Sequence, residues 1–168
     1  MAAFTEMFWN EQTSLPLLLI LQLLPLFGAA VVLALGERLS AVLAGKVFAL
    51  AELVLCIVAL SQINPTLPDL QLAERFEPLA YHVAVDGLSL IFLLLSALLT
   101  FLMTLYGMSR GMISPGRLFA VLLVAEAGLV GMLVTLNVAW FAALSALELW
   151  AVAFLLRRWA SSRAEIQA

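Results

Sequence analysis

Residues 118–156 read LFAVLLVAEAGLVGMLVTLNVAWFAALSALELWAVAFLL. The stretch holds two apolar runs, each about as long as a helix needs to cross the roughly 30 Å of bilayer hydrocarbon. Neither run shows the strict alternation of polar and apolar residues that is typical of a barrel strand. We therefore expect two membrane-spanning helices here, from about 118 to 136 and from about 138 to 156.

Three further apolar runs precede this stretch, at about residues 14–36, 39–63 and 85–108. Of the 168 residues, 65% are hydrophobic and 11% are charged, and the mean hydropathy is +1.13. A soluble domain is roughly half apolar and a quarter charged. The sequence therefore predicts an all-α membrane protein of about five transmembrane helices, which form a single membrane domain over residues 1–168.

The basic residues are distributed unevenly between the two sides of such a five-span chain. Only Arg75 lies on one side, in the connection 64–84. The other seven lie together on the opposite side: Arg38, Lys46, Arg110, Arg117, Arg157, Arg158 and Arg163. The positive-inside rule then predicts that the N-terminus is outside and that the tail 157–168 is cytoplasmic. The connection 64–84 mixes acidic and apolar residues, so we expect an ordered extracytoplasmic loop.

Several classes of function are excluded or disfavoured. Cys56 is the only cysteine and His82 the only histidine, so the chain cannot form a multi-cysteine metal site, and His82 reads as a solvated loop residue. No glycine-rich phosphate loop or catalytic triad stands out. The net charge of -3 gives no reason to expect nucleic acid. We therefore expect no metal, no cofactor and no catalytic site of the chain's own.

Four acidic residues fall in or at the rim of predicted spans: Asp86 at the membrane edge, and Glu52, Glu126 and Glu148 further inside. A carboxylate near the bilayer centre costs a few kcal/mol, and such residues commonly serve transport. No Lys or Arg lies deep in any predicted span. The acids are therefore either neutral and hydrogen-bonded within the chain, or paired with another subunit. We rank the three inner acids as proton-transfer candidates in the order Glu126, Glu148, Glu52, with a structural role as the alternative for each.

Other residues have clear structural interpretations. Asp86 precedes Gly87 at the start of the third predicted span, where its side chain can cap the free backbone amides. In the last two spans, small residues recur four apart, as Ala127 with Gly131 and Ala142 with Ala146. Such pairs let helix backbones approach closely. We expect these faces to pack against each other or against a partner.

The stretch YHVAVDGLSLIFLLLSALLTFLMTLYG (81–107) resembles the third helix of the antiporter-like subunits of proton-pumping NADH:quinone oxidoreductase and of Mrp-type cation/proton antiporters, where a DGLS or DGIS motif begins that helix. Residues 119–156 are similar to the next two helices. They look most like the subunit M type, in which Glu126 and Gly131 have counterparts at the same spacing. The resemblance covers nearly the whole chain but only about the first third of a family member.

Two departures from the family pattern stand out. In the family, an essential fifth-helix glutamate lies nine residues after an acidic position that here is Asn137, and nine residues on stands Ala146. Glu148 is two residues further, about 200° round the helix. Family members also continue to a buried lysine and a second inverted repeat.

The resemblance therefore implies a truncated antiporter-like subunit, in the energy-transducing inner (plasma) membrane, that supports or completes a proton-translocating module. Its partners would be antiporter-like subunits that supply the missing helices and buried lysines. Two alternatives stay open. One is a membrane subunit of an energy-coupled inorganic-carbon uptake complex, and the other is a non-conducting scaffold.

Overall fold

The computed structural model describes residues 15–64, 66, 70–109 and 114–160. Within them the prediction of five membrane-length helices is confirmed. The helices are α1 (Leu17–Leu35), α2 (Leu39–Gln62), α3 (Gly87–Ser109), α4 (Pro115–Val134) and α5 (Val138–Leu155), which continues into a π-helical turn, η2 (Leu156–Ala160). The expected leader before the first span, Arg110 and the tail after Ala160 lie outside the described residues.

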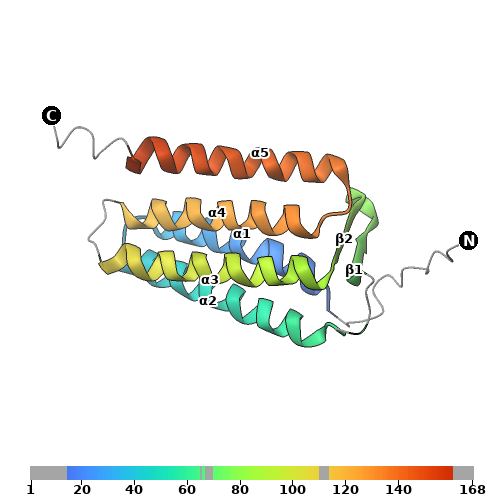
Figure 1. Ribbon diagram of the computed structural model, residues 1–168. Helices are drawn as coiled ribbons and strands as arrows, with labels where there is room; N and C mark the ends of the chain where they lie inside the picture. Colours follow the sequence, from blue (N-terminus) through green and yellow to red (C-terminus); the bar gives the residue numbers. More distant parts are fainter. Residues whose placement is uncertain (1–14, 65, 67–69, 110–113, 161–168) are drawn as a thin grey trace, which may run out of the picture.

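Helices α1 to α4 form a bundle, and α5 lies along its outside (Figure 1). Helix α1 packs on α4 and α2, while α3 packs on α2 and α4. Helix α5 packs mainly on α4, and most of its surface stays exposed. The apolar residues on that surface fit a helix that faces lipid or another subunit.

The predicted ordered loop contains a β-hairpin, which the sequence analysis did not anticipate. Strand β1 (Gln71–Phe76) pairs antiparallel with β2 (Tyr81–Val85), and a short 3-10 turn, η1 (Glu77–Leu79), joins them. We call this end of the bundle the hairpin end. The opposite end, where α1, α3 and α5 finish, is the basic end, because it carries Arg38, Lys46, Arg117, Arg157 and Arg158 (Figure 1).

The hairpin also explains why α4 stops earlier than expected. The Leu136 amide donates to the His82 carbonyl oxygen at 2.9 Å, and Thr135 forms a β-bridge with Val83. Both residues therefore extend the hairpin rather than the helix. At its other end α4 begins at Pro115 instead of about Leu118, because proline is well suited to the first helical position.

The start of α4 is held by a side chain from the turn between α1 and α2. Glu37 Oε2 accepts a hydrogen bond from the Gly116 amide at 3.0 Å, and Glu37 Oε1 lies 3.4 Å from Arg117 Nε. A carboxylate at a helix N-terminus satisfies free amides and opposes the helix dipole. This contact fixes the height of α4 against α1, on which the site depends.

The buried apolar side chains form two clusters along the bundle. One lies toward the hairpin end and includes Leu21, Cys56, Leu93 and Val130. The other lies toward the basic end and includes Ala49, Phe119 and Leu123. On α2 the switch from one cluster to the other occurs between Ala49 and Cys56, and on α4 between Leu123 and Val130. Both intervals contain a buried glutamate.

Candidate functional site

A layer of buried polar groups separates the two apolar clusters. Glu52 lies near the middle of α2 and is fully buried, and Glu126 lies near the middle of α4 and is 4% exposed. Burying these carboxyls in hydrocarbon is costly unless they are hydrogen-bonded or neutral. This layer is the candidate functional site.

Glu126 is held by two hydroxyl groups of α3. Thr100 Oγ1 donates to Glu126 Oε2 at 2.5 Å, and Ser96 Oγ lies 2.9 Å from Glu126 Oε1. Ser96 and Thr100 are four residues apart, so they present both hydroxyls on one face of α3. The carboxyl of Glu126 therefore has a polar partner for each oxygen.

The Ser96 hydroxyl has two acceptors within reach but only one proton to donate. Its Oγ lies 2.9 Å from Glu126 Oε1 and 3.0 Å from the Leu93 carbonyl oxygen. If Glu126 is ionised, Ser96 can donate to it. If Glu126 is protonated, the carboxyl can donate to Ser96 Oγ while Ser96 donates to Leu93. The same side-chain positions thus accommodate both protonation states.

Glu52 lies on the other side of the layer, in a less polar setting. Among the described residues neither of its carboxyl oxygens has a hydrogen-bond partner. Its charge interacts electrostatically with that of Glu126, so the two groups lie near each other across the interior. Buried polar groups in proteins are normally hydrogen-bonded, so Glu52 is an exception to that rule. It is explained if Glu52 is protonated and neutral, or if the residue has a functional role.

Glu148 faces α4 from the middle of α5. A Cβ built on Gly128 would lie 3.3 Å from both Cβ and Oε2 of Glu148, so the two helices are in close contact there. Glu148 Oε2 is buried without a hydrogen-bond partner in the described structure, and its charge interacts with that of Glu126. Ala146, at the position expected from the family pattern, is exposed. In this fold Glu148 is the residue of the two that points toward the bundle.

The three acids therefore form a row that runs across the helices, from α5 through α4 to α2. Electrostatic interactions join Glu148 to Glu126 and Glu126 to Glu52. In Figure 1 these three helices lie on successive levels of the molecule, with α5 on one side and α2 on the other. The sequence predicted the three residues but not that they are neighbours.

Gly131 lies at a crossing of three helices. A Cβ at this position would come within 2.5 Å of Gln22 Nε2 on α1 and within 2.6 Å of Leu144 Cδ1 on α5. Gln22 is buried and its Oε1 accepts a hydrogen bond from the Tyr81 hydroxyl of β2. Absence of a side chain at Gly131 thus lets α1 and α5 approach α4 just beyond the acid row.

The other predicted packing residues divide into two groups. Ala127 is fully buried in α4, next to Gly128, which the sequence analysis did not single out. Ala142 and Ala146 of α5 lie on the exposed side of the helix. Within this chain the α4 face is therefore used for helix packing, and the α5 alanines are not.

Glu74 has a structural role that the sequence analysis did not predict. It lies on β1 and is 6% exposed, and its two oxygens accept the Leu18 amide at 2.7 Å and the Leu19 amide at 3.0 Å. Helix α1 has no side-chain cap of its own, so Glu74 caps it from the hairpin. Burial raises the pKa of Glu74, and the amide hydrogen bonds oppose that shift.

Asp86 occupies the position expected for a helix cap. Its Oδ1 accepts the Ser89 amide at 2.7 Å, in the first turn of α3. Hydrogen bonds from Ser89 hold the pKa of Asp86 below its usual range. His82 lies on β2, opposite Arg75, rather than in a free loop.

Two observations bear on identity. Among the described residues, no group of three or more His, Cys, Asp or Glu side chains is placed to hold a metal ion. In the comparisons with known proteins, no family model and no curated protein matched this sequence.

Proposed function

We propose that this chain is an antiporter-like membrane subunit that passes protons between Glu148, Glu126 and Glu52. The observation that carries the proposal is the arrangement around Glu126, where the Ser96 hydroxyl can serve as a donor to the ionised acid or an acceptor from the protonated one. A proton carrier must be stable in both states, and this arrangement supplies hydrogen bonds to each without moving a helix.

Transfer along the row follows from the interactions between its members. Like charges disfavour each other, so a proton leaving Glu126 makes it harder for Glu148 or Glu52 to ionise at the same time. A proton that reaches Glu148 or Glu52 therefore favours release of a proton from its neighbour Glu126. The direction of such movement is across the bundle, from one lateral face toward the other, which suits a subunit within a larger assembly.

The neighbours of this subunit would complete the path. Glu148 lies at the edge of the row, and α5 packs mainly on α4 and leaves most of its surface exposed. We place antiporter-like partner subunits, with their buried lysines, beside it. In the same proposal the basic end faces the cytoplasm and the hairpin end faces outward, in an energy-transducing inner membrane.

Infrared difference spectroscopy on the full chain tests whether Glu126 gains and loses a proton. We expect the band of a protonated carboxyl group to change with pH, and that change to be lost in Glu126→Gln. The control is Glu77→Gln, because Glu77 is an exposed acid in the hairpin, away from the acid row. A pH-dependent band that is unchanged in Glu126→Gln would contradict a titrating Glu126.

Identification of the proteins that co-purify with the chain tests the wider assignment. Flavin and iron–sulfur subunits would support a redox-driven pump. A zinc protein of the carbonic-anhydrase kind would support the inorganic-carbon uptake complex instead.

A non-conducting scaffold is the second candidate, and one observation favours it. Both oxygens of Glu126 have hydroxyl partners within the chain, as a purely structural acid would require. The scaffold predicts that Glu126→Gln keeps full activity of the parent complex, since a protonated Glu and a Gln offer α3 similar hydrogen bonds.

A further inference from the structure

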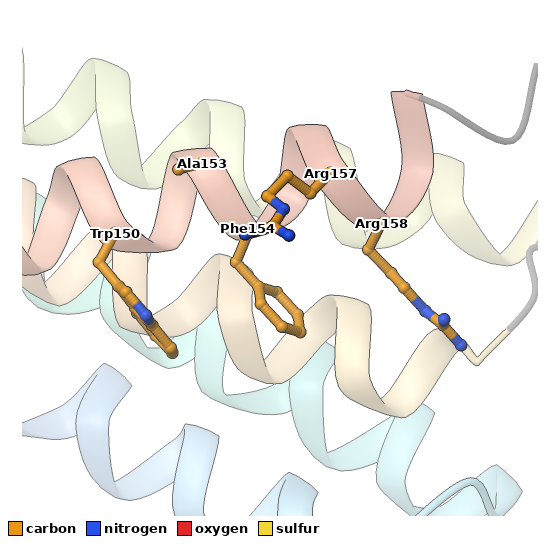
Figure 2. A pocket seen from close by; sticks show the side chains of 5 residues that line it. All are labelled: Trp150, Ala153, Phe154, Arg157 and Arg158. Carbon is orange, nitrogen blue, oxygen red and sulfur yellow. The ribbon is translucent and has the colours of Figure 1, made fainter. Parts of the chain in front are cut away.

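An open hollow of about 380 Å³ lies on the side of α5 at the basic end. Its lining residues are Trp150, Ala153, Phe154, Arg157 and Arg158. Figure 2 shows Trp150, Phe154 and Arg158 projecting from the same side of the helix. The lining therefore combines an apolar wall with two arginines, of which Arg158 extends beyond Phe154 while the side chain of Arg157 bends back toward Phe154 (Figure 2).

The apolar wall is built by two stacked aromatic rings. Trp150 and Phe154 are one helical turn apart, and their ring centroids lie 5.8 Å apart with 25° between the planes. Trp150 is 57% exposed and Phe154 is 38% exposed, so both rings present broad faces to the surroundings. Such apolar faces are suited to contact with acyl chains.

The position of the hollow along the membrane normal can be read from α5 itself. Glu148 belongs to the acid row near mid-span, and Arg157 follows it by nine residues, or about 14 Å along a helix. That distance is close to half the thickness of the hydrocarbon core, which is about 15 Å. The end of α5 that carries Arg157 and Arg158 therefore lies close to the level of the lipid phosphates, while Trp150 lies near the bilayer centre.

The positive charge of the two lining arginines favours anionic lipids over zwitterionic ones. None of the five lining residues is acidic, and two are arginines on adjacent positions of the π-helical turn η2. Arginine binds phosphate through a planar set of donors, and basic pockets at the cytoplasmic side of membrane proteins commonly receive anionic headgroups. The headgroup of a zwitterionic lipid carries a positive charge of its own beside the phosphate, and the two arginines would repel that charge.

We propose that this hollow is a binding site for one anionic phospholipid, with its phosphate on Arg157 and Arg158 and one acyl chain along Phe154 and Trp150. The site is independent of the acid row, because none of its residues belongs to that row. Lipid binding can therefore be measured without proton transport, and either proposal can fail alone.

Native mass spectrometry of the full chain in neutral detergent tests the site with phosphatidylglycerol as the probe. We expect saturable binding of one tightly held phosphatidylglycerol and at least about tenfold weaker binding of phosphatidylcholine with the same chains. The double variant Arg157→Gln/Arg158→Gln should weaken phosphatidylglycerol binding by about tenfold or more. Arg38→Gln/Lys46→Gln removes the same charge from the same end and should leave the tight site intact.

The apolar wall is tested separately with Phe154→Ala, and with glycerol phosphate as a headgroup without acyl chains. The variant should weaken phosphatidylglycerol binding, and glycerol phosphate should not displace the lipid at equal concentration. Equal binding of phosphatidylglycerol and phosphatidylcholine would overturn the proposal. So would equal losses in the two charge variants, because charge at that end alone would then explain binding.

Discussion

Thr100 Oγ1 lies 2.5 Å from Glu126 Oε2, and this contact joins α3 to α4 in the middle of the bundle. The hydroxyl gives a buried carboxyl a hydrogen-bond partner within the chain. Both helices must keep their rotation and height for the contact to form, so the polar layer also fixes how the bundle packs.

Removal of that hydroxyl should therefore weaken the fold. Thr100→Val leaves Glu126 Oε2 buried without its donor, which costs about 1–3 kcal/mol of the free energy of unfolding. Thr104→Val is the matched control, because Thr104 is fully buried on the same face of α3 but bonds only to the Phe101 carbonyl of its own helix. Unfolding in mixed detergent micelles measures both, and an equal loss in the two variants would contradict a specific role for Thr100.

The close approach at Gly131 gives a second prediction. Gly131→Ala places a methyl group 2.5 Å from Gln22 Nε2 and 2.6 Å from Leu144 Cδ1, so these two buried side chains must move, at a cost of about 1–3 kcal/mol. Gly128→Ala meets Glu148 only at 3.3 Å and should cost less, and Gly87→Ala meets nothing within 4 Å. The order of the three unfolding midpoints checks the packing of α1 and α5 on α4. A Gly131→Ala protein as stable as Gly87→Ala would contradict the close packing of Gln22 and Leu144 on Gly131.

Glu74 should make stability depend on pH. Its pKa is raised in the folded protein by burial, from about 4.3 in an unfolded chain, so the folded state holds more protons between the two values. The contribution of this group to stability is therefore greatest below the unfolded pKa and declines as pH rises through the folded pKa. Thermal unfolding measured from about pH 4 upward should show this decline of stability with rising pH.

The slope should be smaller in Glu74→Gln, because the amide does not titrate. The same variant should be destabilised by about 1–3 kcal/mol, since an amide group can accept only one of the two α1 hydrogen bonds. Glu77→Gln is the control in the same hairpin, because Glu77 is exposed and pairs with Arg75. An identical pH dependence in Glu74→Gln and the unaltered chain would remove Glu74 as its source.

Orientation is tested with reporters on both ends of the bundle. The asymmetry of Lys and Arg predicts that a reporter fused after Ala168 is cytoplasmic and that one inserted near Asp69 is outside. Enzymatic reporters that are active on only one side of the membrane give the answer. The reverse pattern would overturn the proposed orientation while leaving the five helices untouched.

The helices could be predicted from sequence because each is a continuous apolar run of membrane-spanning length. The hairpin could not, because Gln71–Phe76 contains a register shift and Leu72 has a positive φ of 53°, which disrupt the alternation of a regular strand. Glu74 was missed for a related reason. A charged residue in a loop predicts exposure, and only the fold brings it to α1, 55 residues or more away in sequence.

The acid row, too, could be predicted from sequence only in part, because its residues stand out but their contacts do not. The sequence identifies Glu52, Glu126 and Glu148 because a carboxyl inside an apolar run is costly, and that cost is local information. The partners Ser96 and Thr100 are unremarkable on their own, since hydroxyl residues in a helix commonly bond to their own backbone. In the sequence, only their spacing of four residues within one predicted helix indicated that both hydroxyls share a face.

Proton movement through Glu126 is the central claim, and the parent complex reconstituted in vesicles tests it most directly. Proton uptake is measured for Glu126→Gln, Glu126→Asp and Glu126→Leu, with assembly checked for each. We expect Glu126→Gln to assemble normally and to lose proton uptake by about an order of magnitude or more, because an amide cannot accept and release a proton near neutral pH. Glu126→Asp should keep part of the activity, and Glu126→Leu should also weaken assembly by leaving Thr100 without its acceptor. Full proton uptake in an assembled Glu126→Gln complex would contradict the account and favour the scaffold.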